Sequence, residues 1–186
     1  PETAENVAEK FQITRQDQDL FAYRSQIKAA NSIENGRISK EILTVTIKQK
    51  RKDDLIVNKD EHPRKTDLEK LSKLSTPFKN DGSVTAGNSS GVNDGAAALI
   101  IASEDAIKKN NLKPIARIVN AASSGVEPRI MGMGPVSATE KVLKKSNIKL
   151  NQIDTVEINE AFAAQVLACT RELGIQDDDP RVNPNG

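Results

Sequence analysis

The sequence of 186 residues is poor in several residue types. It has one cysteine, Cys169, no tryptophan, and aromatic residues make up only 3% of the chain. A single cysteine excludes an internal disulfide and a multi-cysteine metal site, and it points to a reducing compartment. The net charge is +1, because 27 Lys and Arg nearly balance 26 Asp and Glu. This balance removes any strong electrostatic case for DNA, RNA or an anionic membrane surface as a partner.

Long hydrophobic runs are also missing. The apolar run 95–102 is too short to span a bilayer, and the first residues lack the charged and apolar regions of a signal peptide. We therefore expect a soluble, cytoplasmic protein. Both ends of the sequence are unusual, because it opens on Pro1 without an initiator methionine and stops at Gly186 within a polar stretch. These ends predict a piece of a longer polypeptide.

Apolar residues are unevenly spread along the chain. Residues 1–81 are dominated by Lys, Asp, Glu, Gln and Asn, whereas residues 84–170 carry the long runs of Ala, Ile, Val and Leu. We interpret the first part as a polar segment that lies over, or beside, a more apolar core formed by the second part. In the second part strand-like runs alternate with helical patterns, which indicates α/β architecture.

Helix start signals recur along the sequence. Thr14 and Asp17 resemble a capping box before an amphipathic helix that ends at the glycine cap Gly36. A shorter helix is expected over 5–11. Similar signals predict four further helices, over 66–74, over 103–110, from Ser137 onward, and over 160–173 with Gly174 as its cap.

Strands are expected where β-branched and aliphatic residues run together. The pattern predicts a half-buried strand over 42–47 and a second one at 55–57, followed in the apolar half by a fully buried strand over 96–102, a second apolar run at 115–121, and a short strand at 155–158. The basic run 48–52 lacks interleaved aromatics and is followed at once by two Asp. We interpret it as a solvated hairpin tip, not as a nucleic-acid site.

The junction 157–165 is the most suggestive place for chemistry. Asn159 follows a predicted strand and precedes a predicted helix, the position at which open α/β sheets usually bind ligands. From spacing alone, an N-cap that satisfies helix amides is the favoured interpretation. The alternative is a fixed dipole that orients a water or an oxyanion.

Three other features have simpler interpretations. The glycine-rich loop 86–95 contains neither nucleotide-binding glycine pattern, so a P-loop is not expected. His62 has no second His or Cys nearby, and we expect an exposed structural histidine with no metal site. Cys169 lies near the end of an Ala-rich helix, where buried packing is the expected role because a nucleophile needs exposure and an activating partner.

Three motifs together resemble the thiolases. They are Asn-Glu-Ala-Phe-Ala-Ala-Gln at 159–165, the loop at 85–97, and Met-Gly-Met-Gly-Pro at 131–135, and they occur in the order and at the spacing of that family. The resemblance covers essentially the whole chain. Within the thiolases, the segments 60–64 and 171–186 look most like bacterial 3-oxoadipyl-CoA thiolases, although acetoacetyl-CoA and fatty-acid thiolases share most of the same motifs.

The resemblance implies a fold and a reaction. The fold is the thiolase-like α/β fold, with residues 1–89 as the end of the polar loop domain and residues 90–186 as the first part of the C-terminal core domain. A thiolase cleaves a 3-oxoacyl-CoA with coenzyme A through a cysteine acyl-enzyme, and it uses CoA as a substrate without a prosthetic group or metal. Homodimers and homotetramers are usual in the family.

The resemblance also assigns roles residue by residue. Asn159 matches the family residue that holds a water in the oxyanion hole. Residues expected to contact coenzyme A or the acyl chain are Arg64, Phe78, Ala86, Ser90, Met131, Ala161 and Phe162. The catalytic cysteines and the histidine of the family have no match in this chain, and neither Cys169 nor His62 takes their place. The chain alone is therefore expected to have no thiolase turnover.

Two alternatives remain open from the sequence. A non-catalytic module could bind coenzyme A or a partner chain through the retained loop and helix, and an α/β domain without a ligand is the third interpretation. Arg129 is a conceivable partner for a terminal carboxylate of the acyl chain, since a guanidinium suits carboxylate geometry. A solvent-exposed arginine on the loop before Met131 is the more ordinary explanation.

Overall fold

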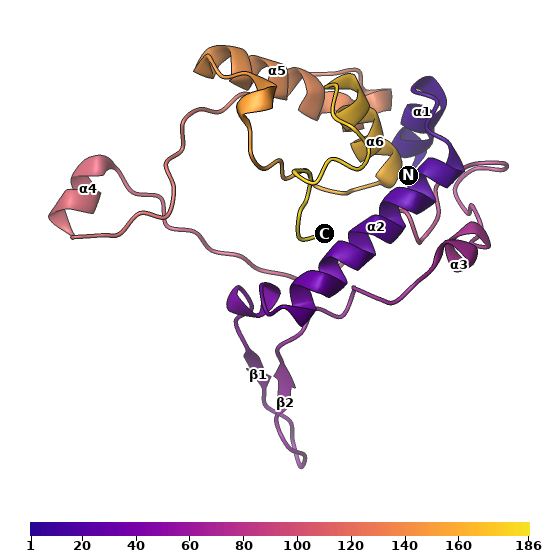
Figure 1. Cartoon of the computed structure of the whole chain (residues 1–186). Helices are drawn as coiled ribbons and strands as arrows, with labels where there is room; N and C mark the ends of the chain where they lie inside the picture. The colour runs from indigo at the N-terminus through magenta and orange to yellow at the C-terminus, as the bar shows by residue number, and fades with distance from the viewer.

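The long helix α2 (Arg15–Glu34) runs through the centre of the protein in the computed structural model, which describes all 186 residues (Figure 1). Its predicted start is confirmed. Thr14 Oγ1 accepts a hydrogen bond from the Asp17 amide at 3.1 Å, and the Asp17 carboxylate accepts one from the Thr14 amide at 3.2 Å. The helix ends at Asn35, and Gly36 follows with φ +77°, a conformation that glycine adopts without strain.

The core forms where three helical segments meet beside α2. They are α1 (Glu2–Lys10), the 3₁₀ helix η2 (Pro128–Met133) and α6 (Ala163–Glu172). Helix α6 packs against α1, α2 and η2, and its residues 163–170 are all buried. Apolar side chains of α1, η2 and α6 form one cluster. The body of the protein is therefore helical, and α6 lies at its centre.

Helix α5 (Gly134–Ser146) begins three residues before the predicted start at Ser137. Pro135 occupies the first turn, where its missing N–H costs nothing and its fixed φ favours the helix. Ser137 consequently lies inside the helix, and the predicted capping box there is wrong. A third 3₁₀ helix, η3 (Leu150–Gln152), follows α5.

Two shorter helices test the other predicted caps. Helix α3 (Leu68–Ser72) is capped by Asp67, whose side chain accepts from the Lys70 amide, so the cap lies one residue after the predicted Thr66. Helix α4 (Glu104–Lys109) is capped by Ser103, as predicted. Asp competes well with Thr for the cap position because its carboxylate accepts from a first-turn amide at least as well as a hydroxyl does.

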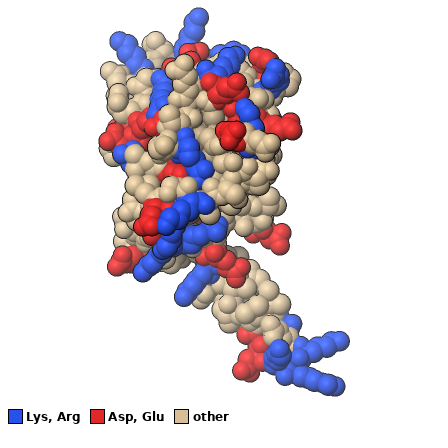
Figure 2. Space-filling view, turned by 90° about the vertical axis from the view of Figure 1, so that its right-hand side faces the viewer, with Lys and Arg blue, Asp and Glu red and all other residues tan.

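The strands β1 (Val45–Ile47) and β2 (Leu55–Val57) form an antiparallel hairpin that follows the 3₁₀ helix η1 (Ile38–Lys40) and extends away from the helical body (Figure 1). All three β1 residues are exposed, so the predicted half-buried strand is shorter and more exposed than expected. The basic run 48–52 lies at the far end of the hairpin, where Figure 2 shows blue side chains beside red ones. Lys48 pairs with Asp54 at 2.5 Å.

The predicted buried strand over 96–102 is not formed. The segment makes no backbone hydrogen bond, and Leu99, Ile100 and Ile101 are each more than three-quarters exposed. The apolar run 115–121 is likewise irregular and exposed. A strand needs a hydrogen-bonded neighbour, and β1 and β2 pair only with each other. No helix of the chain is long and apolar enough to cross a membrane.

The predicted strand at 155–158 shrinks to a single bridge. Val156 pairs in parallel with Val182, with the Val156 amide donating to Arg181 O at 2.9 Å and the Asn183 amide donating to Val156 O at 2.9 Å. This bridge brings residues 181–186 against the segment that leads into α6. It positions one wall of the site described next.

Candidate functional site

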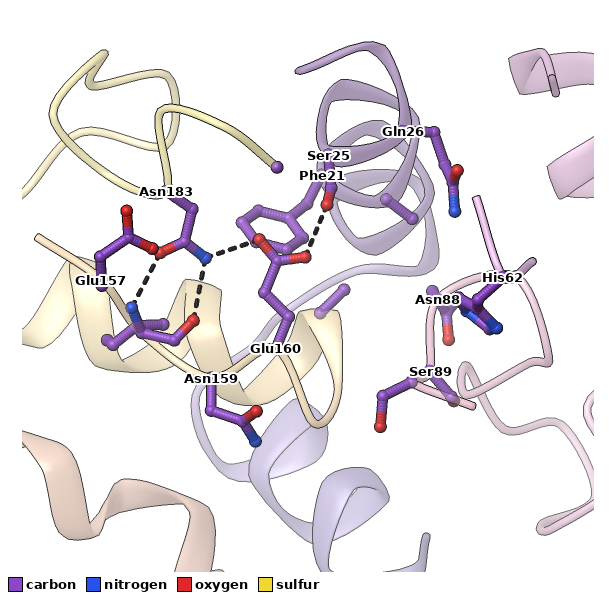
Figure 3. A pocket seen from close by; sticks show the side chains of 16 residues that line it. Phe21, Ser25, Gln26, His62, Asn88, Ser89, Glu157, Asn159, Glu160 and Asn183 are labelled. Atoms are coloured by element: carbon purple, nitrogen blue, oxygen red, sulfur yellow. Dashed lines mark hydrogen bonds between the residues drawn. The ribbon is translucent and has the colours of Figure 1, made fainter. Parts of the chain in front are cut away.

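A cleft of about 350 Å³ opens between four parts of the chain that are far apart in sequence (Figure 3). Helix α2 forms one side, the loop 87–90 a second, the junction 157–160 a third, and Asn183 with Gly186 the fourth. No Lys or Arg lines the cleft. No group of three or more His, Cys, Asp or Glu is arranged to hold a metal ion anywhere in the chain.

Two buried side chains fix the loop that borders the cleft. The carboxylate of Glu5, on α1, accepts hydrogen bonds from the amides of Ser83 and Val84, both at 2.9 Å. Asn88 is 3% exposed, accepts from the Thr85 amide at 2.8 Å, and donates to Asp19 of α2 at 3.1 Å. Such fully paired buried groups hold the loop in one conformation.

The same loop is hydrogen-bonded to the start of α6. The Ser90 amide donates to Ala161 O at 3.0 Å, and the Ala163 amide donates to Asn88 O at 2.9 Å, on either side of an antiparallel bridge between Ser89 and Phe162. Three residues of the predicted coenzyme A set, Ser90, Ala161 and Phe162, therefore lie side by side. Their proximity follows from pairing between segments about 70 residues apart.

Asn159 lies on the junction wall of the cleft (Figure 3). The N-cap of α6 is Phe162, and it makes no side-chain cap hydrogen bond. The favoured sequence interpretation, in which Asn159 caps the helix, is therefore wrong. Asn159 is exposed, and Figure 3 draws no hydrogen bond to its amide. The side chain is free to bind a ligand or water in the cleft.

Sequence reasoning missed a hydrogen-bonded group beside Asn159. One Glu160 carboxylate oxygen accepts from Asn183 Nδ2 at 2.6 Å, and the other accepts from Ser25 Oγ of α2 at 2.7 Å. Asn183 also donates to Ile158 O at 2.9 Å and accepts from the Ile158 amide at 2.8 Å. No local sequence pattern predicts the hydrogen bonds among Ser25, Glu160 and Asn183, because Ser25 and Asn183 are separated by most of the chain.

Of the seven predicted contact residues only Ser90 lines the cleft; Ala161 and Phe162 lie next to it through the pairing just described, and the other four lie elsewhere. Arg64 is exposed, and its backbone amide donates to Gln26 of α2 at 2.9 Å. Ala86 is exposed on the loop next to the lining residues. Phe78 is 47% exposed and Met131, on η2, is 64% exposed. These side chains are accessible, but they lie outside the cleft that contains Asn159.

His62 differs from its expected position. It is half-buried and lines the cleft, and it packs so closely on Gly91 that a Cβ built there would lie 2.7 Å from the imidazole ring. The expected fully exposed histidine is therefore wrong. Pro63 and the charged residues around His62 gave no sign of this packing, because its neighbour Gly91 belongs to a loop distant in sequence.

Cys169 is fully buried in the core cluster, as predicted. Its thiol donates to Gly132 O at 3.2 Å, and burial raises its pKa to about 11. A raised pKa keeps the sulfur in the thiol form, which is a poor nucleophile. Cys169 therefore has a packing role.

Alkylation should test this assignment. At pH 8 a shift of the pKa from 9 to about 11 lowers the thiolate fraction about 100-fold, and burial adds a steric barrier. We expect iodoacetamide to label the Cys169 peptide at least about 100-fold more slowly in native protein than in urea, as measured by peptide mass spectrometry. Labelling of Cys169 at equal rates in the two states would contradict its burial.

The exposed Arg129 contributes only its backbone to a contact in the chain, where its carbonyl accepts from Asn6 Nδ2 at 3.1 Å. It does not line the cleft. This placement agrees with the ordinary explanation of an arginine on the surface before Met131.

Comparison with known proteins relates the whole chain to one family. The model of the thiolase N-terminal domain matches residues 2–105, and that of the thiolase C-terminal domain matches residues 112–186. The beta-ketoadipyl-CoA thiolase of Acinetobacter baylyi is 55% identical over 187 residues, which cover 100% of this chain and 47% of that protein. The chain thus spans about half the length of the curated relatives it matches.

Solved structures agree with this relationship. An acetyl-CoA acetyltransferase of Bacillus anthracis has a TM-score of 0.94 and 49% identity, with 100% of this chain and 46% of that chain covered. Human mitochondrial 3-ketoacyl-CoA thiolase, solved in complex with CoA, has a TM-score of 0.92 and 47% identity, with coverage of 100% and 45%. The α/β thiolase fold expected from the sequence is therefore confirmed, and the chain belongs to the thiolase family.

Proposed function

We propose that this chain is part of an acyltransferase that cleaves a 3-oxoacyl-CoA with coenzyme A, giving acetyl-CoA and an acyl-CoA two carbons shorter. The observation that carries the proposal is the free Asn159 amide in a cleft bordered by the Ser90 loop. The relatives support 3-oxoadipyl-CoA as the substrate, since the similar protein of Acinetobacter baylyi is named a beta-ketoadipyl-CoA thiolase.

Asn159 is proposed to hold a water that stabilises the negative charge on the thioester oxygen. A cysteine thiolate attacks the 3-oxo carbonyl, and the charge on the thioester oxygen develops when the bond between C2 and C3 breaks and the acetyl-CoA unit leaves as an enolate. A positioned hydrogen-bonding group lowers this barrier most when it costs no reorganisation. Cys169 is unsuited to the attack because it is buried and its pKa is raised to about 11. The nucleophile and the histidine are proposed to come from outside residues 1–186, so the chain alone is inactive.

Coenzyme A is proposed to lie along the loop and the start of α6, with Ala86, Ser90, Ala161 and Phe162 closest to it. Arg64, Phe78 and Met131, whose side chains are exposed, are proposed as further contacts of the bound coenzyme A or acyl chain. In this proposal residues 1–89 belong to the loop domain and residues 90–186 to the C-terminal core domain. The whole protein would act in the cytoplasm as a homodimer or homotetramer.

Thiolysis assays test the proposal. The full-length gene product would be mixed with coenzyme A and 3-oxoadipyl-CoA, and acetyl-CoA formation followed by chromatography, with acetoacetyl-CoA and a straight-chain 3-oxoacyl-CoA as comparison substrates. We expect turnover of all three, with the largest kcat/KM for 3-oxoadipyl-CoA. Absence of turnover with every substrate would overturn the proposed reaction, and a preference for a straight chain would overturn the substrate alone.

Ser90 gives a separate test of the coenzyme A surface. Replacing the exposed Ser90 by alanine removes one hydroxyl from the loop while its backbone pairing to Ala161 remains. We expect the Kd for coenzyme A, measured by calorimetry on the full-length protein, to rise about 3- to 10-fold, the effect of one hydrogen bond. Ser39→Ala changes a serine on η1 that is also exposed; it is the matched control and should leave the Kd unchanged. An unchanged Kd for Ser90→Ala would remove this loop from the binding surface.

A further inference from the structure

The residues on both sides of Asn159 are held by side chains from distant parts of the fold. Before it, Ile158 has its backbone amide and carbonyl paired with the side chain of Asn183, at 2.8 and 2.9 Å. After it, Glu160 has one carboxylate oxygen bound by Asn183 and the other by Ser25. Asn159 itself has no such partner (Figure 3). The junction is therefore fixed around a side chain that remains free.

Glu160 connects the three walls of the cleft that meet at this point. It belongs to the junction, Ser25 belongs to α2, and Asn183 belongs to the segment that is paired with the junction through Val156. Asn183 is 4% exposed, so its hydrogen bonds are shielded from competing water. Glu160 accepts both of its hydrogen bonds from these other walls, at 2.6 Å from Asn183 and at 2.7 Å from Ser25.

We propose that Glu160 is a positioning residue, which acts through Asn183 and Ser25 to aim the Asn159 amide at the reacting thioester. The inference rests on the proposed thiolase function, because it assigns a task to Asn159. Glu160 does not touch the substrate or exchange a proton in this proposal. Its carboxylate serves as a double acceptor that fixes the backbone next to Asn159.

This role predicts how two Glu160 variants differ. Glu160→Ala removes both acceptors, so the junction loses its ties to α2 and to Asn183. Glu160→Gln keeps an acceptor for Asn183 and offers an amide donor to the Ser25 hydroxyl, which can also accept. A positioning residue tolerates the second change, whereas a carboxylate that transfers a proton or supplies charge does not.

Steady-state kinetics of the full-length protein test the proposal. We expect Glu160→Ala to lower kcat about 10- to 100-fold with KM for coenzyme A within about twofold, and Glu160→Gln to recover most of the loss. The double variant Asn159→Ala/Glu160→Ala should be no slower than Asn159→Ala, because Glu160 acts only through Asn159. Glu172→Ala, which removes an exposed carboxylate from α6, is the control and should leave kcat unchanged.

Three results would overturn the positioning role. The first is a multiplicative loss in the double variant, and the second is a Glu160→Gln variant as slow as Glu160→Ala. The third is an unchanged kcat with only a lower Tm, which would leave Glu160 a purely structural residue.

A crystal structure of the Glu160→Ala variant separates this proposal from the proposed reaction. It needs no turnover, so it is informative even if the wild-type protein cleaves no 3-oxoacyl-CoA. We expect the Asn159 side chain to shift or to lose a single defined position while α6 remains in place. An Asn159 side chain that superimposes on the wild type would overturn the positioning role whatever the enzyme activity.

Discussion

Replacing Asn159 by alanine is expected to lower kcat for thiolysis by the full-length protein about 100-fold, with KM for coenzyme A within about twofold. This is the effect of deleting one hydrogen-bonding group from an oxyanion site. The substitution should not disturb the fold, because the Asn159 side chain is exposed and makes no hydrogen bond that holds the fold (Figure 3). The loss should therefore appear in catalysis and not in Tm.

Two further variants sharpen this measurement. Asn159→Asp keeps the size of the side chain but places a negative charge where negative charge develops, so we expect a loss of kcat at least as large as for alanine. Asn151→Ala changes an exposed asparagine on η3, away from the cleft, and should have full activity. If Asn159→Ala retained wild-type kcat, its proposed role in the oxyanion hole would be wrong.

The largest effect on stability is expected from Asn183→Ala. The substitution leaves the backbone amide and carbonyl of Ile158 and one oxygen of Glu160 without their partner, in a place where the Asn183 side chain is 4% exposed. Each unpaired buried group costs about 1–3 kcal/mol. Asn183 also has φ +42°, which asparagine tolerates better than alanine. We expect the free energy of unfolding of the full-length protein, from urea titration, to fall by about 3–4 kcal/mol.

Asn147→Ala provides the matched control for the backbone contribution. Asn147 ends α5 with φ +53°, and it is exposed. Its replacement should cost only the conformational penalty of about 1 kcal/mol. A loss for Asn183→Ala no larger than this would mean that water replaces its hydrogen bonds, and that Asn183 does not hold the junction.

Helix starts were predictable because their causes are local. Thr14 and Asp17 lie within one turn and satisfy each other's backbone amides, whatever packs around them. Ser103 caps α4 in the same way. The predicted start at Ser137 failed because Pro135, a local signal as well, favours the first turn two residues earlier. Competing signals of similar strength limit such predictions to within a few residues.

Strands were less predictable because their stability depends on a neighbour. Residues 96–102 have the composition of a buried strand, yet they make no backbone hydrogen bonds in the chain. The hydrophobic pattern indicates which face a strand would bury, but it does not show whether a second strand is present to pair with it. The hairpin at 45–57 forms because its two strands are close in sequence, so the connection 48–54 brings them together.

The site was predicted only in part, for the same reason. Asn159 stood out because it joins a strand-like run to a helix, and the motif around it resembles the thiolases. Glu160 lies beside it but gave no signal of its own, since Ser25 and Asn183 reach it only after the chain has folded. His62 came to the cleft through a contact with Gly91 that no sequence pattern encodes.

The walls of the cleft are far apart along the chain, so during synthesis on the ribosome they become available at different times. Lys28 donates to Val182 O, and Ser32 to Asn185, across more than 150 residues. Contacts of such separation close large loops and form late in folding. A ribosome that adds about 5–20 residues per second needs roughly 8–30 s to pass from α2 to Asn185. During that time the cleft lacks the wall formed by Asn183 and Gly186. If the proposed function is right, nascent chains should therefore bind no coenzyme A there until this last wall has emerged.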